Sequence, residues 1–147
     1  MFTNILVPTD GSPRSERAIK QAVQLAKEQQ AQVTGIFVAP AYRPDMREEM
    51  SSMNVESPRR YAERAEALAR KRLRPLEKAA SEAGVPCELL HAVSDHPYDE
   101  IVRTANRKKC DLIFMASQGR TGLSRLLLGS QTSKVLAMSK VPVIVTR

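Results

Sequence analysis

Residues 2–40 have the sequence FTNILVPTDGSPRSERAIKQAVQLAKEQQAQVTGIFVAP, which carries the signals of a strand, a helix and a second strand in turn. The first apolar run, 2–8, holds three consecutive aliphatic residues, as expected for a strand that is covered on both faces. Ser12 is a suitable helix N-cap and Pro13 suits the first helical position, after which apolar residues recur at helical spacing. The helix is long enough to cross to a parallel strand at 32–40. The stretch therefore predicts a parallel βαβ unit.

The same alternation continues to the end of the chain. Ser57 and Pro58 repeat the helix-start signal, and the helix that follows ends at Gly84. Pro75 lies inside this helix and predicts a kink or a division, because proline removes one backbone hydrogen bond. Three further strands are predicted at 85–93, 111–117 and 141–147, the first of them at a sheet edge. The remaining two helices are expected to open at Asp95, His96 and Pro97 and to include Val135, Leu136 and Met138.

Five strands that alternate with four helices predict the α/β class. We expect a single domain over residues 1–147, with an open, mostly parallel five-stranded sheet and helices on both faces. In such sheets ligands bind at the carboxyl ends of the strands, where the strand order reverses. The candidate site is therefore formed by the loops after strands one, two and four, at 8–12, 38–39 and 116–132.

Composition excludes several classes of protein. With 42% apolar and 27% charged residues, and without an apolar run of roughly 18 residues, the chain has the composition of a globular protein with no membrane partner. The start lacks the basic region of a secretory signal and reaches Asp10 early, so we expect a cytoplasmic protein. Cys87 and Cys110 form no metal or redox motif, and His91 and His96 have no zinc-ligand spacing around them.

The net charge of +7 could favour an anionic partner. Seven basic residues and only two acidic ones lie between Arg59 and Arg74. Nucleic-acid platforms interleave aromatic side chains with bases, and this segment holds only Tyr61. A solvated helix face is therefore the better interpretation, and no nucleic-acid partner is expected.

Residues 39–58 have three prolines and no periodicity, which predicts a long loop. Loops of this length in compact domains usually serve a site or an interface, so a lid or a dimer contact is one hypothesis. The alternative, which we favour, is that Met46, Met50 and Met53 fill gaps on a neighbouring surface.

The stretch FMASQGRTGLSRLLLGSQTS, residues 114–133, is a poor helix and a poor strand. Gly119 lies just beyond the fourth strand, and Gly129 comes directly before Ser130 where a helix should begin. Glycines allow a ligand to approach the backbone, and a helix start offers N–H groups with partial positive charge. The pattern therefore predicts an anion site, with phosphate as the anion. The chain has neither GxxxxGK[ST] nor GxGxxG after its first strand, so a P-loop or a dinucleotide-binding fingerprint is not supported.

Nearly the whole chain resembles the universal stress protein family, through NILVPTDGSPRSERAIKQAVQLA, AVSDHPYDEIVRTANRKKCDLIFMASQGRTGLSRLLLGSQTSKVL and the terminal VPVIVTR. The nucleotide-binding branch of that family has glycine, two residues, glycine, nine residues, then glycine followed by Ser or Thr. Gly119, Gly129 and Ser130 fit this spacing, whereas Ala116 occupies the place of the first glycine. The resemblance implies a Rossmann-like fold of the adenine nucleotide alpha hydrolase-like type.

Carried over by position, the resemblance implies a site for ATP, with AMP and ADP as alternatives and Mg²⁺ held only through the nucleotide. The nucleoside part would be lined by Pro8, Thr9, Asp10 and Val38. The sugar and phosphates would be approached by Met115, Ala116, Gln118 and Gly119, and the phosphate chain held by Gly129, Ser130, Gln131 and Thr132. Asp10 would accept bonds from ribose or base, or meet phosphate through Mg²⁺; the alternative is a turn aspartate at the helix start. No catalytic residue can be assigned, so slow ATP hydrolysis or autophosphorylation is the most that is expected.

The leading hypothesis is a dimeric, nucleotide-sensitive switch in the stress response. The alternative is a nucleotide-free dimeric interaction protein of the same family, in which Ala116 marks a decayed site. The family resemblance implies a homodimer through the C-terminal strand between Val141 and Thr146. A β-branched terminal strand invites pairing with another chain, and Pro142 suits an edge strand.

Overall fold

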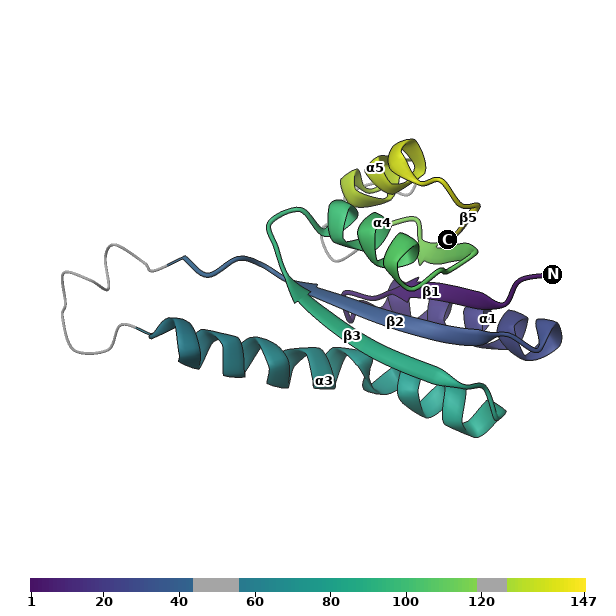
Figure 1. The fold of residues 1–147 in the computed structure, drawn as a ribbon, viewed down its shortest axis with the longest axis horizontal. Helices are drawn as coiled ribbons and strands as arrows, with labels where there is room; N and C mark the ends of the chain where they lie inside the picture. Colours follow the sequence, from purple (N-terminus) through teal and green to yellow (C-terminus); the bar gives the residue numbers. More distant parts are fainter. Residues whose placement is uncertain (44–55, 119–126) are drawn as a thin grey trace.

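The computed structural model describes residues 1–43, 56–118 and 127–147, which form one five-stranded sheet and four helices (Figure 1). In chain order the elements are β1 (Asn4–Pro8), α1 (Pro13–Gln29), β2 (Gln32–Ala39), α3 (Pro58–Ala83), β3 (Cys87–Val93), α4 (Pro97–Arg107), β4 (Leu112–Ala116), α5 (Ser130–Met138) and β5 (Val143–Thr146). The strand order is β3-β2-β1-β4-β5, and all four neighbouring pairs are parallel. The predicted α/β class and the number of elements are confirmed.

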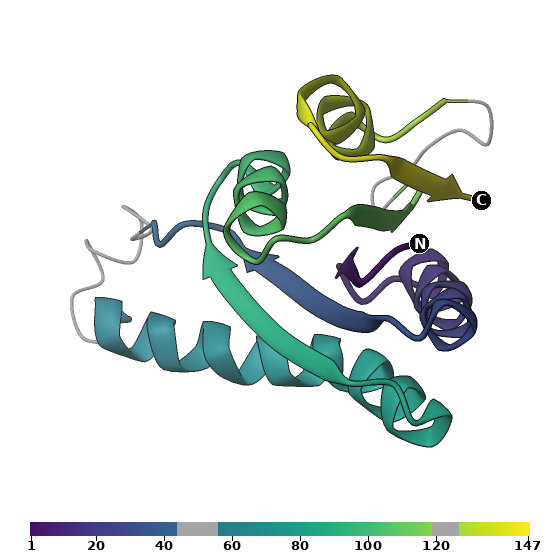
Figure 2. The same cartoon turned by 45° about the vertical axis from the view of Figure 1, so that its right-hand side comes forward.

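The helices cover both faces of the sheet, as Figure 2 shows. On one face α1 and α3 pack over the sheet, and Ile19, Val23 and Leu76 join the core there. On the other face α4 and α5 supply Ile101, Ala105 and Val135 to a second cluster. The central strands β1 and β4 are buried along their whole length, because apolar side chains meet a helix layer on either side. The outer strands β3 and β5 are partly exposed, which confirms the predicted edge position of the third strand.

The helix boundaries follow from local signals. Ser12 is the N-cap of α1, and its Oγ accepts a hydrogen bond of 3.2 Å from the backbone N–H of Ser15. Ser57 caps α3 in the same way through the N–H of Arg60, also at 3.2 Å. Gly84 ends α3 in the left-handed conformation with φ of 70°, which glycine adopts without steric cost. These predicted boundaries are confirmed.

Of the two outcomes predicted at Pro75, a kink or a division, the division is wrong, because α3 continues through Pro75 to Ala83. A kink stays a prediction. Packing explains the difference. Leu73 and Leu76 are buried on either side of the proline and press on β2 at Gly35, where an added Cβ would lie 2.4 Å from Leu76 Cδ2. A proline inside a helix costs about 3 kcal/mol, and each fully buried leucine contributes roughly 1.5–3 kcal/mol. The tertiary contacts therefore outweigh the local penalty.

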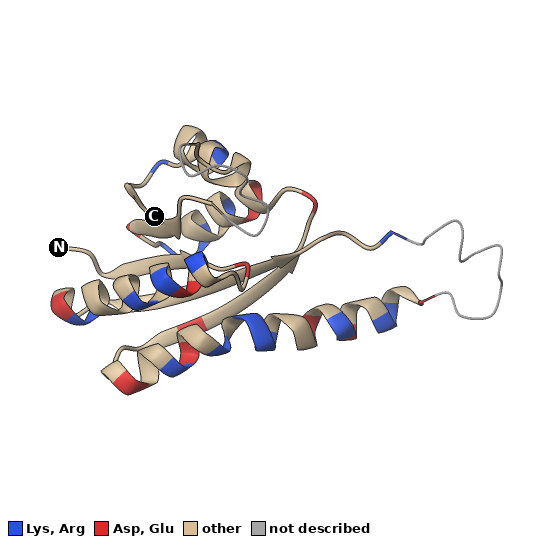
Figure 3. Ribbon diagram, turned by 180° about the vertical axis from the view of Figure 1, so that it is seen from behind, with Lys and Arg blue, Asp and Glu red and all other residues tan. Residues whose placement is uncertain are grey.

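Basic residues recur along the length of α3 (Figure 3), and all of them except the half-buried Arg72 are exposed. Three of them form ion pairs one helical turn apart: Arg59 with Glu63 and Arg70 with Glu66, each at 3.4 Å, and Lys78 with Glu82 at 4.0 Å. Such exposed pairs contribute only about 0.3–0.5 kcal/mol each, so they keep the face soluble rather than hold the fold together. This arrangement agrees with a solvated helix face.

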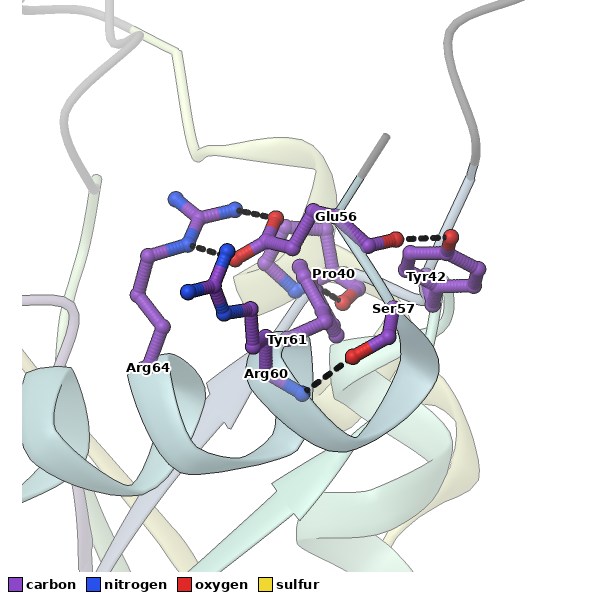
Figure 4. Close-up of polar contacts among 7 residues, drawn as sticks. All are labelled: Pro40, Tyr42, Glu56, Ser57, Arg60, Tyr61 and Arg64. Carbon is purple, nitrogen blue, oxygen red and sulfur yellow. Dashed lines mark hydrogen bonds and ion pairs between the residues drawn. The ribbon is translucent and has the colours of Figure 1, made fainter. Parts of the chain in front are cut away.

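A cluster of polar and aromatic side chains ties the end of β2 to the start of α3 (Figure 4). The Tyr61 hydroxyl donates to the backbone oxygen of Pro40, and the Tyr42 hydroxyl donates to that of Glu56. Arg64 lies 5.3 Å from the centre of the Tyr61 ring and donates two hydrogen bonds of 2.8 Å to the Glu56 carboxylate. The lid or dimer-contact hypothesis concerns the loop 39–58. Within it, residues 44–55, and Met46, Met50 and Met53 with them, lie outside the described residues.

Among the residues that the structure describes, no helix is long and apolar enough to cross a membrane, and no three potential metal ligands cluster together. Cys87 and Cys110 are free cysteines. Cys110 lies in the core behind α4, where burial raises the pKa of its thiol to about 11. That thiol is protonated, and therefore unreactive, at neutral pH.

Candidate nucleotide site

The candidate site lies where the sheet changes direction. From β1 the chain proceeds to β2 and β3 on one side, and β4 and β5 occupy the other side, so the order reverses between β1 and β4. The loops after these two strands lead to helices on opposite faces, α1 and α5. Such a switch point leaves a crevice at the carboxyl edge of the sheet. The structure places every described residue of the predicted site at this edge; Gly119 lies outside the described residues.

The β1–α1 turn is held in one conformation by its own side chains. The Oδ1 atom of Asp10 accepts hydrogen bonds from the Ser12 N–H at 2.9 Å and from the Ser15 hydroxyl at 2.7 Å. The backbone N–H of Thr9 donates to Ile36 of β2 at 3.0 Å, and the Thr9 hydroxyl accepts from Gly11 at 3.2 Å. Asp10 therefore acts as a turn aspartate, and the same bonds fix the direction of its carboxylate at the strand end.

Gly11 is required by the shape of this turn. Its φ is 78°, which disfavours any residue with a side chain. An added Cβ would also lie 2.3 Å from Cδ and 2.8 Å from Nη1 of Arg72. The side chain of Arg72 thus reaches from α3 across the turn, and its guanidinium lies close to the turn backbone.

Met115 and Ala116 end β4 and face opposite layers. Met115 joins the α4 and α5 cluster, whereas Ala116 joins the cluster that α1 and α3 cover. Gln30 and Lys109 are the non-glycine residues with positive φ in the described part of the chain, so Ala116 has no strained backbone. The Ala116 carbonyl accepts a hydrogen bond of 3.0 Å from the Thr132 hydroxyl. The methyl group of Ala116 therefore points toward the α1 layer and its carbonyl toward α5.

Helix α5 begins beside the end of β4. Gly129 is its N-cap, with φ of −60° and ψ of 153°, and the Gly129 N–H donates to the Ser117 carbonyl at 2.8 Å. Because the N-cap is glycine, it has no side chain that could accept from the first-turn N–H groups of Ser130, Gln131 and Thr132. The Gln131 side chain accepts a 3.0 Å bond from the Tyr98 N–H at the start of α4. Gln131 can therefore offer its backbone, but not its amide oxygen, to a ligand.

Gln118 connects the two halves of the site. It is only 3% exposed, its Oε1 accepts from the guanidinium of Arg14 on α1, and its Nε2 donates to the backbone oxygen of Leu127. The sequence pattern did not point to Arg14 as a site residue. No local signal could do so, because Arg14 and Gln118 are 104 residues apart and meet only through the strand order.

Val38 and Pro8 complete the edge on the side of β2. Pro8 is buried at the end of β1 and is paired with Ile36. Val38 is half-buried and packs against the cluster under α4. Along this edge, the ends of β2 and β1 therefore contribute apolar side chains, whereas the end of β4 and the start of α5 contribute polar groups. This is a suitable surface for a ligand with an apolar ring at one end and negative charge at the other.

These features define a class: a doubly wound α/β domain with an uncapped helix start at its switch point. Residues 1–147 match the universal stress protein family, and the chain belongs to that family. It is 37% identical to a universal stress protein of Methanocaldococcus jannaschii, over 100% of this chain and 83% of the relative. It is 36% identical to the universal stress protein YxiE of Bacillus subtilis, over 100% of both chains.

Two solved structures have the same fold. The universal stress protein UspA of Lactobacillus plantarum is 29% identical, with a TM-score of 0.74 over 99% of this chain and 97% of that chain. A universal stress protein solved in complex with cAMP is 27% identical, with a TM-score of 0.70 over 99% of this chain and 97% of that chain. The family and the Rossmann-like architecture that the resemblance implied are confirmed.

Proposed function

We propose that this protein binds an adenine nucleotide at the carboxyl edge of β1, β2 and β4, with ATP as the ligand and AMP and ADP as alternatives. The base and ribose lie along Pro8, Thr9, Asp10 and Val38. The phosphates lie at the start of α5, near Gly129, Ser130, Gln131 and Thr132. Mg²⁺ enters with the nucleotide and is held through its phosphates.

The observation that carries this proposal is the position of the α5 start. Its glycine N-cap is anchored to the Ser117 carbonyl at 2.8 Å, and Thr132 is anchored to the Ala116 carbonyl at 3.0 Å. Both bonds hold the first helical turn against the switch point, where the N–H groups and the helix dipole favour an anion. The similar protein in complex with cAMP supports an adenine nucleotide as the ligand class.

The geometry of Ala116 removes the main objection to nucleotide binding. In the family motif this position is glycine, so an added methyl group could obstruct the ligand. Here the methyl is packed in the cluster with Ala18 and Ala22 of α1, and only the Ala116 carbonyl is directed at α5. A glycine at this position would present the same carbonyl. Alanine is therefore compatible with the site.

We further propose that the nucleotide biases the geometry of a homodimer, which forms through the C-terminal strand between Val141 and Thr146, in a cytoplasmic stress response. Strand β5 lies at the sheet edge, and its pairing with β4 leaves its other side for a second strand. Leu136 and Met138 of the adjoining α5 are 42% and 58% exposed and would extend such an interface. Turnover, if it occurs, is limited to slow ATP hydrolysis or autophosphorylation, because no general base or phosphate-binding lysine is assigned.

A nucleotide-free interaction protein is the alternative function, and the alanine at position 116 is the observation that favours it. Substitution of Gly129 separates the two. Gly129→Val should abolish ATP binding in calorimetry, because the branched side chain would occupy the space beside the first-turn N–H groups. Gly84→Ala controls for lost stability alone, because the φ of 70° strains an added side chain there and Gly84 lies at the far end of α3.

Mass spectrometry of small molecules released from freshly purified protein should identify an adenine nucleotide. The proposal is wrong if the protein releases no nucleotide and calorimetry with millimolar Mg-ATP gives no heat. An unchanged affinity of Gly129→Val for ATP would show that the nucleotide does not bind at the start of α5.

A further inference from the structure

Arg14 occupies a position that helix electrostatics disfavour. It is the second residue of α1, directly after Pro13, where the helix dipole has its positive end. A cation in the first turn costs about 0.3–1 kcal/mol, whereas an acidic residue such as Glu16 in the same turn is favourable. The side chain of Arg14 is half-buried rather than extended into solvent. Its location therefore needs an explanation other than helix stability.

The contact of Arg14 with Gln118 places its guanidinium over the crevice. Arg14 belongs to the α1 layer on one face, and Gln118 follows β4 on the other side of the switch point. Gln118 in turn donates to the carbonyl of Leu127, two residues before the Gly129 N-cap of α5. One buried amide thus joins the guanidinium to the segment that leads into the anion-binding helix start.

We propose that Arg14 is a phosphate-binding residue of the nucleotide site, held in position by Gln118. This inference rests on the proposed nucleotide function and names the group that compensates the charge of the phosphates. A guanidinium has five N–H donors in a planar fork that fits phosphate oxygens, so it can bind phosphate while Gln118 accepts one of its bonds. The α5 start supplies backbone N–H groups from one side, and Arg14 supplies a full positive charge from the other.

The charges around the turn agree with this role. Asp10 is the carboxylate inside the turn, and its Oδ1 is engaged by Ser12 and Ser15. Arg72 reaches the same turn from α3, at Gly11. The turn and the start of α1 thus bring two guanidiniums, those of Arg14 and Arg72, and one carboxylate to this edge, and the excess positive charge favours an anion there. Each additional phosphate on the ligand should then increase affinity, in the order adenosine, AMP, ATP.

The test measures the dissociation constants of adenosine, AMP and ATP for the wild type, Arg14→Ala and Arg17→Ala by calorimetry. Arg14→Ala should weaken ATP about tenfold or more and leave adenosine within about twofold, because a charge-assisted hydrogen bond to phosphate is lost. Arg17→Ala removes the same charge from an exposed position on the same helix and should change neither ligand by more than about twofold. Arg14→Lys should recover only part of the affinity, since an ammonium lacks the planar fork.

Thermal unfolding gives a second readout. Without nucleotide, Arg14→Ala should change the Tm only slightly, because the unfavourable charge at the helix start and the hydrogen bond to Gln118 are lost together and have opposite effects. With Mg-ATP, its Tm should rise less than that of the wild type. The proposal is overturned if Arg14→Ala and Arg17→Ala bind ATP equally, if adenosine weakens as much as ATP, or if Mg-ATP raises the Tm of Arg14→Ala as much as that of the wild type. If the wild type binds neither ATP nor adenosine, the nucleotide function itself fails, and this result is visible before any substitution is made.

Discussion

The methyl group of Ala116 packs into the α1 side of the core, away from the start of α5. The direction of this methyl group decides whether alanine, in place of the first glycine of the family motif, obstructs a ligand. The sequence identified residue 116 as the departure from the motif. It did not predict where the Ala116 side chain points, because this depends on which face of β4 the residue occupies. Arg14 was not found for a related reason, since its contact with Gln118 spans 104 residues. The glycine and hydroxyl pattern around Gly129 predicted where α5 begins because helix-start signals are local. The other site residues came from the family resemblance and stay a prediction.

Ala116→Gly is expected to leave the dissociation constant of ATP within about twofold while it lowers the free energy of unfolding by about 1 kcal/mol. The loss of stability comes from the freer unfolded chain and the missing buried methyl. Calorimetry and urea unfolding measure the two effects. A tenfold gain in ATP affinity would instead favour the decayed-site alternative.

Asp111 makes stability depend on pH. Its carboxylate accepts bonds from the Thr3 N–H at 2.8 Å, the Thr3 hydroxyl at 2.9 Å and the Asn4 N–H at 3.1 Å. Desolvation raises the pKa of Asp111, but the hydrogen bonds from Asn4 and Thr3 outweigh it and leave the pKa below its ordinary value. The stabilisation is therefore fully present above the unfolded pKa of about 3.9 and is lost as the pH falls through the folded pKa.

Asp111→Asn should lower the free energy of unfolding by about 1 kcal/mol at pH 7. The difference from the wild type should shrink as the pH falls below about 4, which urea unfolding at several pH values can follow. A difference that stays constant down to pH 2 would show that the charge of Asp111 contributes nothing.

Helix α3 shows what sequence signals determine at the scale of an element. Its start at Pro58, its end before Gly84 and its place beneath the sheet follow from capping residues and periodicity. Its continuity through Pro75 does not, because it depends on the contact of Leu73 and Leu76 with Gly35 of a strand distant in sequence. The start of α5 at Ser130 was predictable since glycine and hydroxyl residues mark it locally.

Pro75→Ala is expected to raise the free energy of unfolding by about 1–3 kcal/mol, because alanine restores a helix hydrogen bond without changing the two buried leucines. Denaturant unfolding measures the gain, and the neighbouring exposed substitution Arg74→Ala serves as the control. A loss of stability in Pro75→Ala would mean that the proline ring itself packs favourably.

At the scale of the whole molecule, the parallel sheet and its two layers were predictable from alternation alone, and the edge strands from their prolines and polar residues. The proposed dimer, in which a second copy of the chain pairs with β5, can be tested by removing a backbone donor from the free side of this strand. The backbone N–H of Ile113 donates to the Pro142 carbonyl at 3.0 Å, and that of Ser117 donates to the Thr146 carbonyl at 2.7 Å. The backbone groups of residues 142 and 146 therefore face β4. Because alternate residues of a strand direct their backbone groups to opposite sides, the N–H of Val145 faces outward.

Val145→Pro should therefore weaken the dimer at least tenfold, since it removes an outward donor while keeping the ladder to β4. Light scattering over a range of protein concentrations measures the shift, and Val145→Ala, which retains the N–H, controls for lost packing. A wild type that remains monomeric at high concentration would rule out the β5 dimer.

The contacts of Tyr42 and Tyr61 with Glu56 and Pro40 have a consequence for how this scaffold can vary. They close the chain on itself at the start of α3, so the fold is not expected to depend on how many residues lie between Tyr42 and Glu56. Doubling the length of a closed loop costs only about 0.6 kcal/mol. Insertions and deletions between Tyr42 and Glu56 are therefore expected to leave the sheet and the carboxyl edge of β1, β2 and β4 unchanged.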